Sequence, residues 1–405
     1  MSKINRRDFL KSSAIIGSVP LLYPSFVHGM NLAKPQTDRR LVVIILRGGM
    51  DSLSAVIPYA DQEYYKVRRN LAVDSDKVLR LDNYFSLHPS LDVFHNLYRN
   101  RELSVIHSTA LPYRNRSHFD LQNVLELGST RPNSLRDGWL NRLIGEIDSS
   151  NSNLGLSLGQ IVPLIMRGDN KVSSWAPSAL PKMNRDLTSL VKKIYGNDQL
   201  FRDNFAEAIK VKNKAGSMIS SKREEKMTAR SRSPQSIIVM SRMAGKWLSE
   251  QDGPRIATLE MDGWDTHAAQ GSIDGKLSNN FKTLTKAINA LKESLGSTWN
   301  KTTIVTMTEF GRTVAMNGTN GTDHGTASCM FVLGGAVNGG KILSDWPGLE
   351  KSRLYEGRDL MPTTDSRSVL KGILRDLYGI NNRILDNNIF PDSYNAKAID
   401  KLIKI

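Results

Sequence analysis

Five short apolar runs, separated by longer stretches with helical spacing, constrain this sequence more than any other feature. None of the runs alternates cleanly between apolar and polar residues, which is typical of strands buried on both faces of a parallel sheet. The runs are Leu41–Leu46, Leu103–His107, Arg255–Glu260, Thr303–Thr308 and Met330–Leu333. The helical patterns are Pro89–Arg99, Ser117–Leu127, Asp137–Ile147, Pro234–Glu250, Gly275–Leu295 and Asp365–Tyr378. This order predicts an α/β fold in which a mostly parallel central sheet carries helices on both faces.

The first 34 residues do not follow that pattern. They contain Asn5-Arg6-Arg7-Asp8-Phe9-Leu10-Lys11, followed by an apolar stretch over residues 12–27 that glycine and proline interrupt. An arginine pair in this setting is typical of a twin-arginine export signal, and the apolar stretch is too short and too broken to span a bilayer. We therefore expect residues 1–34 to be a signal segment that engages the twin-arginine translocase. Residues 35–405 are expected to form one domain, with no integral membrane span, that acts in the periplasm or outside the cell.

The chain carries a formal net charge of +15 at pH 7. Such an excess suits anionic partners such as phosphate or sulfate esters, although we favour the simpler interpretation that the charges lie on solvated helix faces. Residues 181–233 are rich in lysine and arginine and are interpreted as an exposed helical excursion. Nucleic acid is a disfavoured partner, because the basic clusters there lack interleaved aromatic residues that would stack on bases. The single cysteine, Cys329, excludes a disulfide within the chain and any cysteine-based zinc or haem site.

Acidic residues and histidines gather next to the ends of the predicted strands. Ligands of an open α/β sheet bind at the carboxyl ends of its strands. Asp51 follows the first strand, Asp265 and His267 follow the third, Glu309 follows the fourth, and His324 precedes the fifth. Any one of them is more simply a polar loop residue or a cap. Carboxylates and neutral imidazoles are ligands that zinc accepts, and two of only seven histidines occupy such loops, so the set predicts a metal site.

Ser117 begins the helical pattern that follows the second strand, with Arg114 and Arg116 just before it. Backbone N–H groups at the start of a helix attract anions. A hydroxyl beside arginines at such a position therefore suits a nucleophile that attacks a phosphoryl or sulfuryl centre. A serine at the start of a helix is more commonly an N-cap and nothing more, and the sequence leaves both roles open.

Five motifs, taken together, resemble a widespread family of exported bacterial proteins, the domain of unknown function 1501 family. The motifs are residues 47–51, 116–120, 263–267, 308–312 and 323–325. The resemblance extends from Leu41 to Tyr378. That family is similar in turn to the alkaline phosphatase and sulfatase superfamily, which implies an alkaline-phosphatase-like fold.

The second resemblance also implies roles for particular residues. Those that resemble ligands of a divalent metal, with zinc as the expected ion, are Asp265, His267 and His324. Those that resemble ligands of a second ion, or groups that orient the first, are Asp51 and Glu309. Ser117 resembles the nucleophile, and Arg116 and Arg312 would balance developing negative charge. The superfamily usually has a histidine where Phe310 stands here, so the resemblance implies one or two ions.

These observations predict an exported metal-dependent hydrolase of phosphate or sulfate esters, with esterified glycans as one substrate class. The alternative is a non-catalytic binding or assembly protein built on the same scaffold. In that case the two tryptophan-bearing loops, at Trp139 and Trp264, would stack on sugar rings, although tryptophan is more commonly buried in a core.

Overall fold

The computed structural model describes residues 37–148, 154–159, 161–176, 185–195 and 236–404, together with a few isolated positions between 198 and 209. The predicted signal segment and most of the predicted helical excursion lie outside the described residues. Within the excursion, residues Arg185–Tyr195 form helix α7. Among the helices that are described, none is long and apolar enough to cross a membrane.

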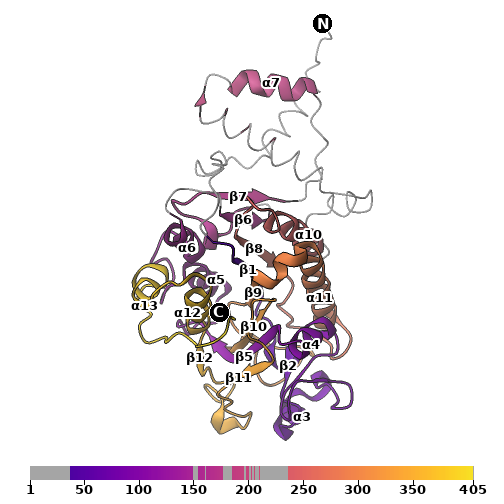
Figure 1. Ribbon diagram of the computed structural model, residues 1–405. Coiled ribbons are helices and arrows are strands. Elements are labelled where there is room, and N and C mark those ends of the chain that lie inside the picture. Colours follow the sequence, from indigo (N-terminus) through magenta and orange to yellow (C-terminus); the bar gives the residue numbers. More distant parts are fainter. Residues whose placement is uncertain are drawn as a thin grey trace.

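A nine-stranded sheet forms the centre of the protein (Figure 1). Its strands, in spatial order, are β11 (Lys341–Leu343), β5 (Leu103–Ala110), β10 (Ser328–Leu333), β9 (Thr302–Met307), β1 (Arg40–Leu46), β8 (Ile256–Met261), β6 (Gly155–Leu158) and β7 (Val172–Trp175), with β12 (Thr364–Asp365) paired to β5. All of these strands run in one direction except β10, which is antiparallel to both β5 and β9. The predicted mostly parallel sheet is confirmed, and the fifth predicted strand is present but reversed.

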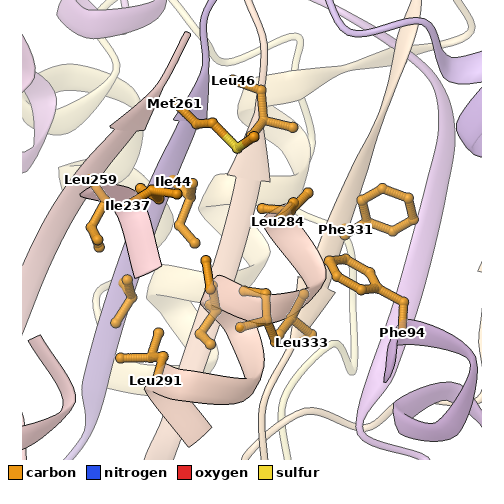
Figure 2. Close-up of a cluster of buried hydrophobic side chains, with 14 of the residues drawn as sticks. Ile44, Leu46, Phe94, Ile237, Leu259, Met261, Leu284, Leu291, Phe331 and Leu333 are labelled. Carbon is orange, nitrogen blue, oxygen red and sulfur yellow. The ribbon is translucent and has the colours of Figure 1, made fainter. Parts of the chain in front are cut away.

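Strand β1 is buried on both faces, which explains why its sequence does not alternate. Three of its side chains, Val42, Ile44 and Leu46, join the core on one face of the sheet. The three between them, Leu41, Val43 and Ile45, join the core on the other face. Figure 2 shows part of the first core, where Ile44 lies near Leu259 and Ile237. Each such side chain stabilises the fold by about 1.5–3 kcal/mol relative to an exposed position, so both layers depend on this strand.

Helices cover both faces of the sheet, as the sequence predicts (Figure 1). Those on one face are α4 (Asp92–Arg99), α10 (Ser236–Leu248) and α11 (Lys276–Leu295). Those on the other face are α5 (His118–Leu127), α6 (Trp139–Ile147) and α12 (Ser366–Tyr378). The smaller elements are α2 (Ser52–Ala55), α3 (Gln62–Arg68), α13 (Asn382–Ile384) and a three-stranded sheet of β2 (Val56–Ile57), β4 (Ser86–Leu87) and β3 (Leu79–Arg80). The six helices that cover the sheet in the described part of the chain coincide with the six predicted helical patterns to within a few residues.

His107 is a titratable group enclosed in this fold. It lies on β5, fully buried, and packs beside Phe85 and Trp346. The Ser108 N–H donates to its Nδ1 at 2.8 Å, so Nε2 carries the proton that is donated to the Val56 carbonyl at 3.2 Å. Both ring nitrogens are thereby satisfied in the neutral form, and burial lowers the pKa of His107 to about 4.

We expect this histidine to make folding sensitive to acid. Its folded pKa of about 4 lies below the unfolded value, so the neutral form favours the folded state fully above about pH 6.5, and that stability is lost as the pH falls toward 4. The contribution lost between pH 7 and pH 5 is about 2 kcal/mol. His107→Gln keeps a donor for the Val56 carbonyl but does not titrate. Denaturant unfolding of this variant should show a fall in stability over that interval smaller by the same amount. An unchanged pH dependence would mean that His107 titrates normally.

Candidate functional site

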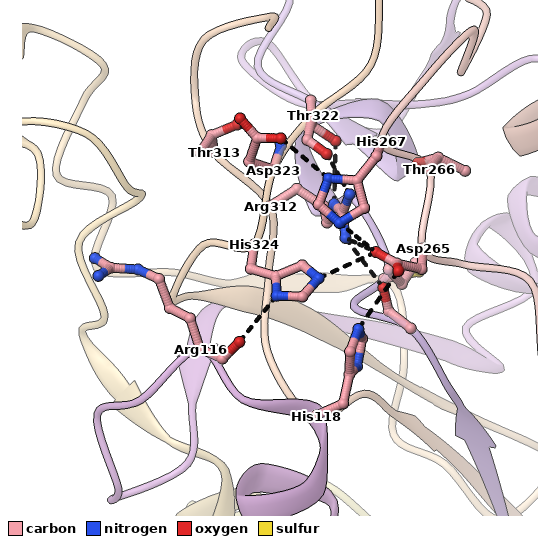
Figure 3. A network of polar contacts seen from close by, with 12 residues as sticks. Arg116, His118, Asp265, Thr266, His267, Arg312, Thr313, Thr322, Asp323 and His324 are labelled. Atoms are coloured by element: carbon pink, nitrogen blue, oxygen red, sulfur yellow. Dashed lines mark hydrogen bonds and ion pairs between the residues drawn. The ribbon is translucent and has the colours of Figure 1, made fainter. Parts of the chain in front are cut away.

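Segments from four places in the chain meet at the carboxyl edge of the sheet (Figure 3). Asp265 follows β8, Glu309 follows β9, and His118 begins α5 just after β5. His324 precedes β10. Because β10 runs against its neighbours, its first residues lie at the edge where the parallel strands end. The reversed strand is therefore what brings His324 to the same edge as Asp265.

The carboxylate of Asp265 is the centre of this group. Its Oδ1 lies 3.0 Å from His267 Nε2 and 3.2 Å from His324 Nε2, and its Oδ2 lies 3.5 Å from His118 Nε2. The Arg312 guanidinium donates to Oδ1 at 2.6 Å. The three imidazoles pack around one another, with ring centroids 4.5 Å apart for His118 and His324 and 4.7 Å for His267 and His324. The structure thus brings together the predicted residues Asp265, His267 and His324.

Each of these histidines has its other ring nitrogen fixed by an acceptor. His118 Nδ1 lies 2.8 Å from Glu309 Oε1, and His267 Nδ1 lies 3.0 Å from Asp323 Oδ1. His324 Nδ1 lies 2.9 Å from the main-chain carbonyl oxygen of Arg116. A carbonyl or an ionised carboxylate can only accept, so each Nδ1 carries a proton and donates it. In the neutral imidazole, Nε2 is then the lone-pair nitrogen, and all three lone pairs point toward Asp265.

The charges around the cluster shift the protonation of its members. Burial alone raises the pKa of Asp265, but the hydrogen bond and charge of Arg312 outweigh it, and the pKa lies below its ordinary value. Burial also opposes ionisation of Glu309, yet hydrogen bonds from His118 and Gln122 hold its pKa low. The hydrogen bond to Glu309 raises the pKa of His118, whereas burial lowers the pKa of His324. Two imidazoles in contact therefore have different proton affinities.

The two predicted arginines do not have free guanidinium groups. Arg312 is fully buried and donates to Asp265, to the Gly48 carbonyl at 3.3 Å and to Thr322. Arg116 turns its guanidinium away from the cluster (Figure 3) and donates to Asp359 at 2.7 and 2.9 Å. The sequence-based role for both residues, balancing charge on an ester, stays a prediction, and in this structure both guanidinium groups are bound to carboxylates. Arg312 orients Asp265, and Arg116 meets the site through its carbonyl oxygen.

Glu309 and Asp51 lie behind the cluster. Glu309 is buried and accepts hydrogen bonds from the Gly48 N–H at 2.8 Å, from His118 and from Gln122 at 2.9 Å. It therefore supports a histidine, and the sequence-based role of Glu309 as a metal ligand stays a prediction. Asp51 is equally buried and pairs with Arg68, whose Nη2 lies 2.9 Å from its Oδ1.

Asp51 is connected to the site only indirectly, through Gln270. Gln270 donates to Asp51 Oδ2 at 2.7 Å and, through its own oxygen, accepts from Thr266 at 2.7 Å and Thr322 at 2.8 Å. Burial opposes ionisation of Asp51, but the charge of Arg68 outweighs it, so the pKa lies below its ordinary value. Asp51 thus anchors the loop that bears Asp265, and its sequence-based role as a metal ligand stays a prediction.

Ser117 caps α5, since its hydroxyl accepts from the Asp120 N–H at a long 3.5 Å. It is partly exposed and stands directly before His118.

The tryptophans that the alternative interpretation assigns to sugar stacking, Trp139 and Trp264, are both fully buried. They pack in the two cores, so stacking on a sugar is ruled out for them.

Sequence reasoning missed His118 as a member of the cluster and Asp323 as the partner of His267. Both stand in motifs that drew attention for another residue, Ser117 in one case and His324 in the other. The available signal was position: His118 is the first residue of a helix that follows a parallel strand. A side chain there lies at the carboxyl edge, where the other candidates were already expected.

Residues 102–387 match the family described as Protein of unknown function (DUF1501). This stretch covers more than half of the chain and includes His118, Asp265, Glu309 and His324. The chain belongs to the DUF1501 family. The family predicted from the sequence motifs is thereby confirmed. No curated protein matches this DUF1501 protein.

Solved structures that resemble the DUF1501 protein include members of the superfamily that the sequence suggested. One is Ps i-CgsB in complex with k-i-k-neocarrahexaose, at 12% identity and TM-score 0.42 over 89% of this chain and 77% of that one. Another is the lipoteichoic acid synthase LtaP from Listeria monocytogenes, at 12% identity and TM-score 0.36 over 87% and 76%. A third is the alkaline phosphatase from the Antarctic bacterium TAB5, at 11% identity and TM-score 0.30 over 77% and 95%. At these TM-scores the likeness bears neither on the site residues nor on a substrate.

Asp51→Asn separates an anchoring role from a ligand role. Removing one partner of a buried ion pair leaves the other charge uncompensated, so we expect a loss of about 3–5 kcal/mol in the free energy of unfolding. The matched control is Asp74→Asn, because Asp74 pairs with Lys77 at 2.8 Å but is 69% exposed. That change should cost less than about 1 kcal/mol. Denaturant unfolding measures both, and a normally stable Asp51→Asn variant that loses bound metal would instead make Asp51 a ligand.

Proposed function

We propose that this protein is an exported, zinc-dependent hydrolase of phosphate or sulfate esters. The proposed ligands are His118, Asp265 and His324, with His267 beside them. The orientation of three imidazoles is the observation that supports this proposal most strongly. Three imidazoles, each with its Nδ1 proton committed elsewhere, direct their Nε2 atoms at a single carboxylate.

That arrangement calls for a cation. Neutral imidazole Nε2 atoms and carboxylate oxygens are all hydrogen-bond acceptors, so they repel one another at 3.0–3.5 Å unless a proton or a metal ion lies between them. Arg312 supplies one charge, but it approaches Asp265 from the buried side and is already shared with Gly48 and Thr322. A divalent ion on the exposed side, where Asp265 is 41% exposed, would satisfy the remaining acceptors.

The donor set fits zinc. His118, Asp265 and His324 each offer a ligand atom, and these atoms all lie within 4.8 Å of one another. Tetrahedral ligands held about 2.0–2.1 Å from zinc lie about 3.3 Å apart. The separations of His324 Nε2 from Asp265 Oδ1, 3.2 Å, and of His118 Nε2 from Asp265 Oδ2, 3.5 Å, are close to this value. Carboxylate and carbonyl partners behind ligand histidines are the usual support of zinc sites. Three protein ligands also leave a fourth position for substrate, as catalytic zinc sites require.

Other residues of the chain would provide the nucleophile, carry a proton and position the ligands. Ser117 is proposed as the nucleophile, because its weakly bonded hydroxyl stands at the N-terminus of α5, where the helix dipole stabilises negative charge. The His267 side chain is 44% exposed and its Nε2 lies 3.0 Å from Asp265 Oδ1, so His267 is proposed to move a proton at that nitrogen. The chemistry that a bound zinc ion supplies is Lewis-acid polarisation of the ester oxygen. Arg312 and Glu309 keep Asp265 and His118 in place.

The proposed location and substrate class depend on features outside the cluster. The arginine pair at Arg6 and Arg7 supports export through the twin-arginine translocase. A net charge of +15 favours anionic esters over neutral ones.

Zinc binding tests the proposed ligands directly. The metal-free protein should bind one equivalent of zinc, and His118→Ala and His324→Ala should each weaken binding by more than about 100-fold, since even loss of a supporting partner costs 10–100-fold. His95→Ala is the matched control, because His95 lies on α4 and bonds to the Arg80 carbonyl, outside the cluster. Competition with a chromophoric chelator measures all three. Equal affinity in the His95 and His324 variants would contradict the ligand assignment.

Turnover tests the nucleophile and the proton carrier. Ser117→Asn keeps a good N-cap but no hydroxyl, and His267→Ala removes the proton carrier. Both variants should retain zinc, while kcat/KM on aryl phosphates or aryl sulfates falls by about 100-fold or more. The measurement is a chromogenic assay on the zinc-loaded protein. If the zinc-loaded wild type cleaves none of these esters, the catalytic proposal fails and a non-catalytic binding protein is left.

A further inference from the structure

Asp359 is a buried carboxylate to which sequence reasoning gave no role. Its side chain is completely inaccessible, and its Oδ2 accepts from Arg116 Nε at 2.9 Å, from Arg116 Nη2 at 2.7 Å and from the Thr326 hydroxyl at 2.9 Å. The Arg358 guanidinium lies 3.2 Å from its Oδ1. A buried charge with this many donors is held in one geometry, because any displacement would break several charge-assisted hydrogen bonds in a medium of low dielectric.

The main chain around Asp359 is fixed as well. Asp359 exchanges hydrogen bonds with Tyr355, N–H to carbonyl in each direction, at 2.9 and 3.0 Å. It also forms an isolated bridge with Thr313, in the strand-like segment that follows Gly311. The carboxylate is therefore a rigid anchor that belongs to the body of the protein, and the segments it binds take their positions from it.

Arg116 connects Asp359 to the cluster. Its guanidinium is bound to Asp359, while its carbonyl oxygen accepts from His324 Nδ1 at 2.9 Å (Figure 3). The same anchor holds the other side of His324, because Thr326, two residues further on, also donates to Asp359. Both chain segments that define the orientation of the His324 ring therefore depend on one carboxylate.

We propose that Asp359 is a positioning residue for His324: by fixing Arg116, it holds the carbonyl oxygen that keeps the proton of His324 on Nδ1 and leaves Nε2 as the lone pair toward Asp265. The metal-binding consequence rests on the proposed function. The tautomer itself does not, because the hydrogen bond from Nδ1 to Arg116 exists without any ion.

The chain offers a close control for this proposal. Arg116 Nη2 also bonds to Glu356 at 2.6 Å, but Glu356 is 56% exposed, whereas Asp359 is inaccessible. An exposed carboxylate is solvated and screened, so it holds its partner weakly. Glu356→Gln should therefore leave the site unchanged, although it removes a charged partner from the same arginine that Asp359→Asn affects.

The experiment uses the full chain labelled with 15N-histidine, in the variants Asp359→Asn, Arg116→Gln and Glu356→Gln. Long-range 1H–15N correlation at about pH 8 reports the tautomer of each histidine in the metal-free protein. Zinc affinity is measured on the same samples by chelator competition. We expect His324 in the wild type and in Glu356→Gln to carry its proton on Nδ1. In Asp359→Asn and Arg116→Gln, the Nε2–H tautomer should appear, and zinc affinity should fall by about 10-fold, the lower end for a supporting group.

The outcomes separate the two proposals. If His324 keeps its Nδ1–H tautomer in both Asp359→Asn and Arg116→Gln, the positioning role is wrong, whatever happens to zinc. If the wild type binds no zinc while the tautomer shifts as expected, the positioning role stands and the proposed function fails. Arg116 is partly exposed at 33%, so Arg116→Gln keeps the test valid if Asp359→Asn does not fold.

Discussion

The convergence of one arginine and three imidazoles on the carboxylate of Asp265 is the interaction on which the site depends. A carboxylate that is 41% exposed would ordinarily be free to rotate into solvent. Here Arg312 holds it from the buried side, and Arg312 is itself fixed by Gly48 and Thr322. The cluster is thus held rigidly on its buried side and is open on its exposed side. Groups in such an arrangement can bind an ion or a substrate without first becoming ordered.

Buried polar groups hold each side of that cluster in place. Glu309 supports His118, Asp359 reaches His324 through Arg116, and Asp51 reaches the Asp265 loop through Gln270. Each buried carboxylate has at least one cationic or imidazole partner and further donors, so its desolvation is offset by strong hydrogen bonds. Ion pairs of this kind add little net stability compared with apolar packing. What they provide here is a fixed orientation for side chains that the loops alone would leave loose.

Much of the fold could be predicted from the sequence because its central strands are apolar on both faces. β1 shows the reason: its neighbours in sequence face opposite cores, so the run has no polar gaps. The direction of β10 could not be predicted, because an apolar run looks alike in either orientation. Short strands such as β12 carry too few residues for any pattern.

The candidate site was predicted in part, for a related reason. Asp265, His267 and His324 stand in loops at strand ends, and strand ends can be located from apolar runs. Which polar residue of a loop points into the cluster depends on contacts between distant segments, and no local pattern encodes those. Asp51 and Glu309 therefore were expected among the ligands although their side chains turn inward, and the first helical residue, His118, was overlooked although its ring turns toward Asp265.

The central claim is that these histidines and Asp265 surround a metal ion. X-ray diffraction from crystals of the zinc-loaded protein, measured on both sides of the zinc absorption edge, tests it most directly. The account predicts one anomalous peak within bonding distance, about 2.0–2.2 Å, of His118 Nε2, His324 Nε2 and a carboxylate oxygen of Asp265. A peak elsewhere, or loaded crystals with no anomalous signal between these residues, would contradict it.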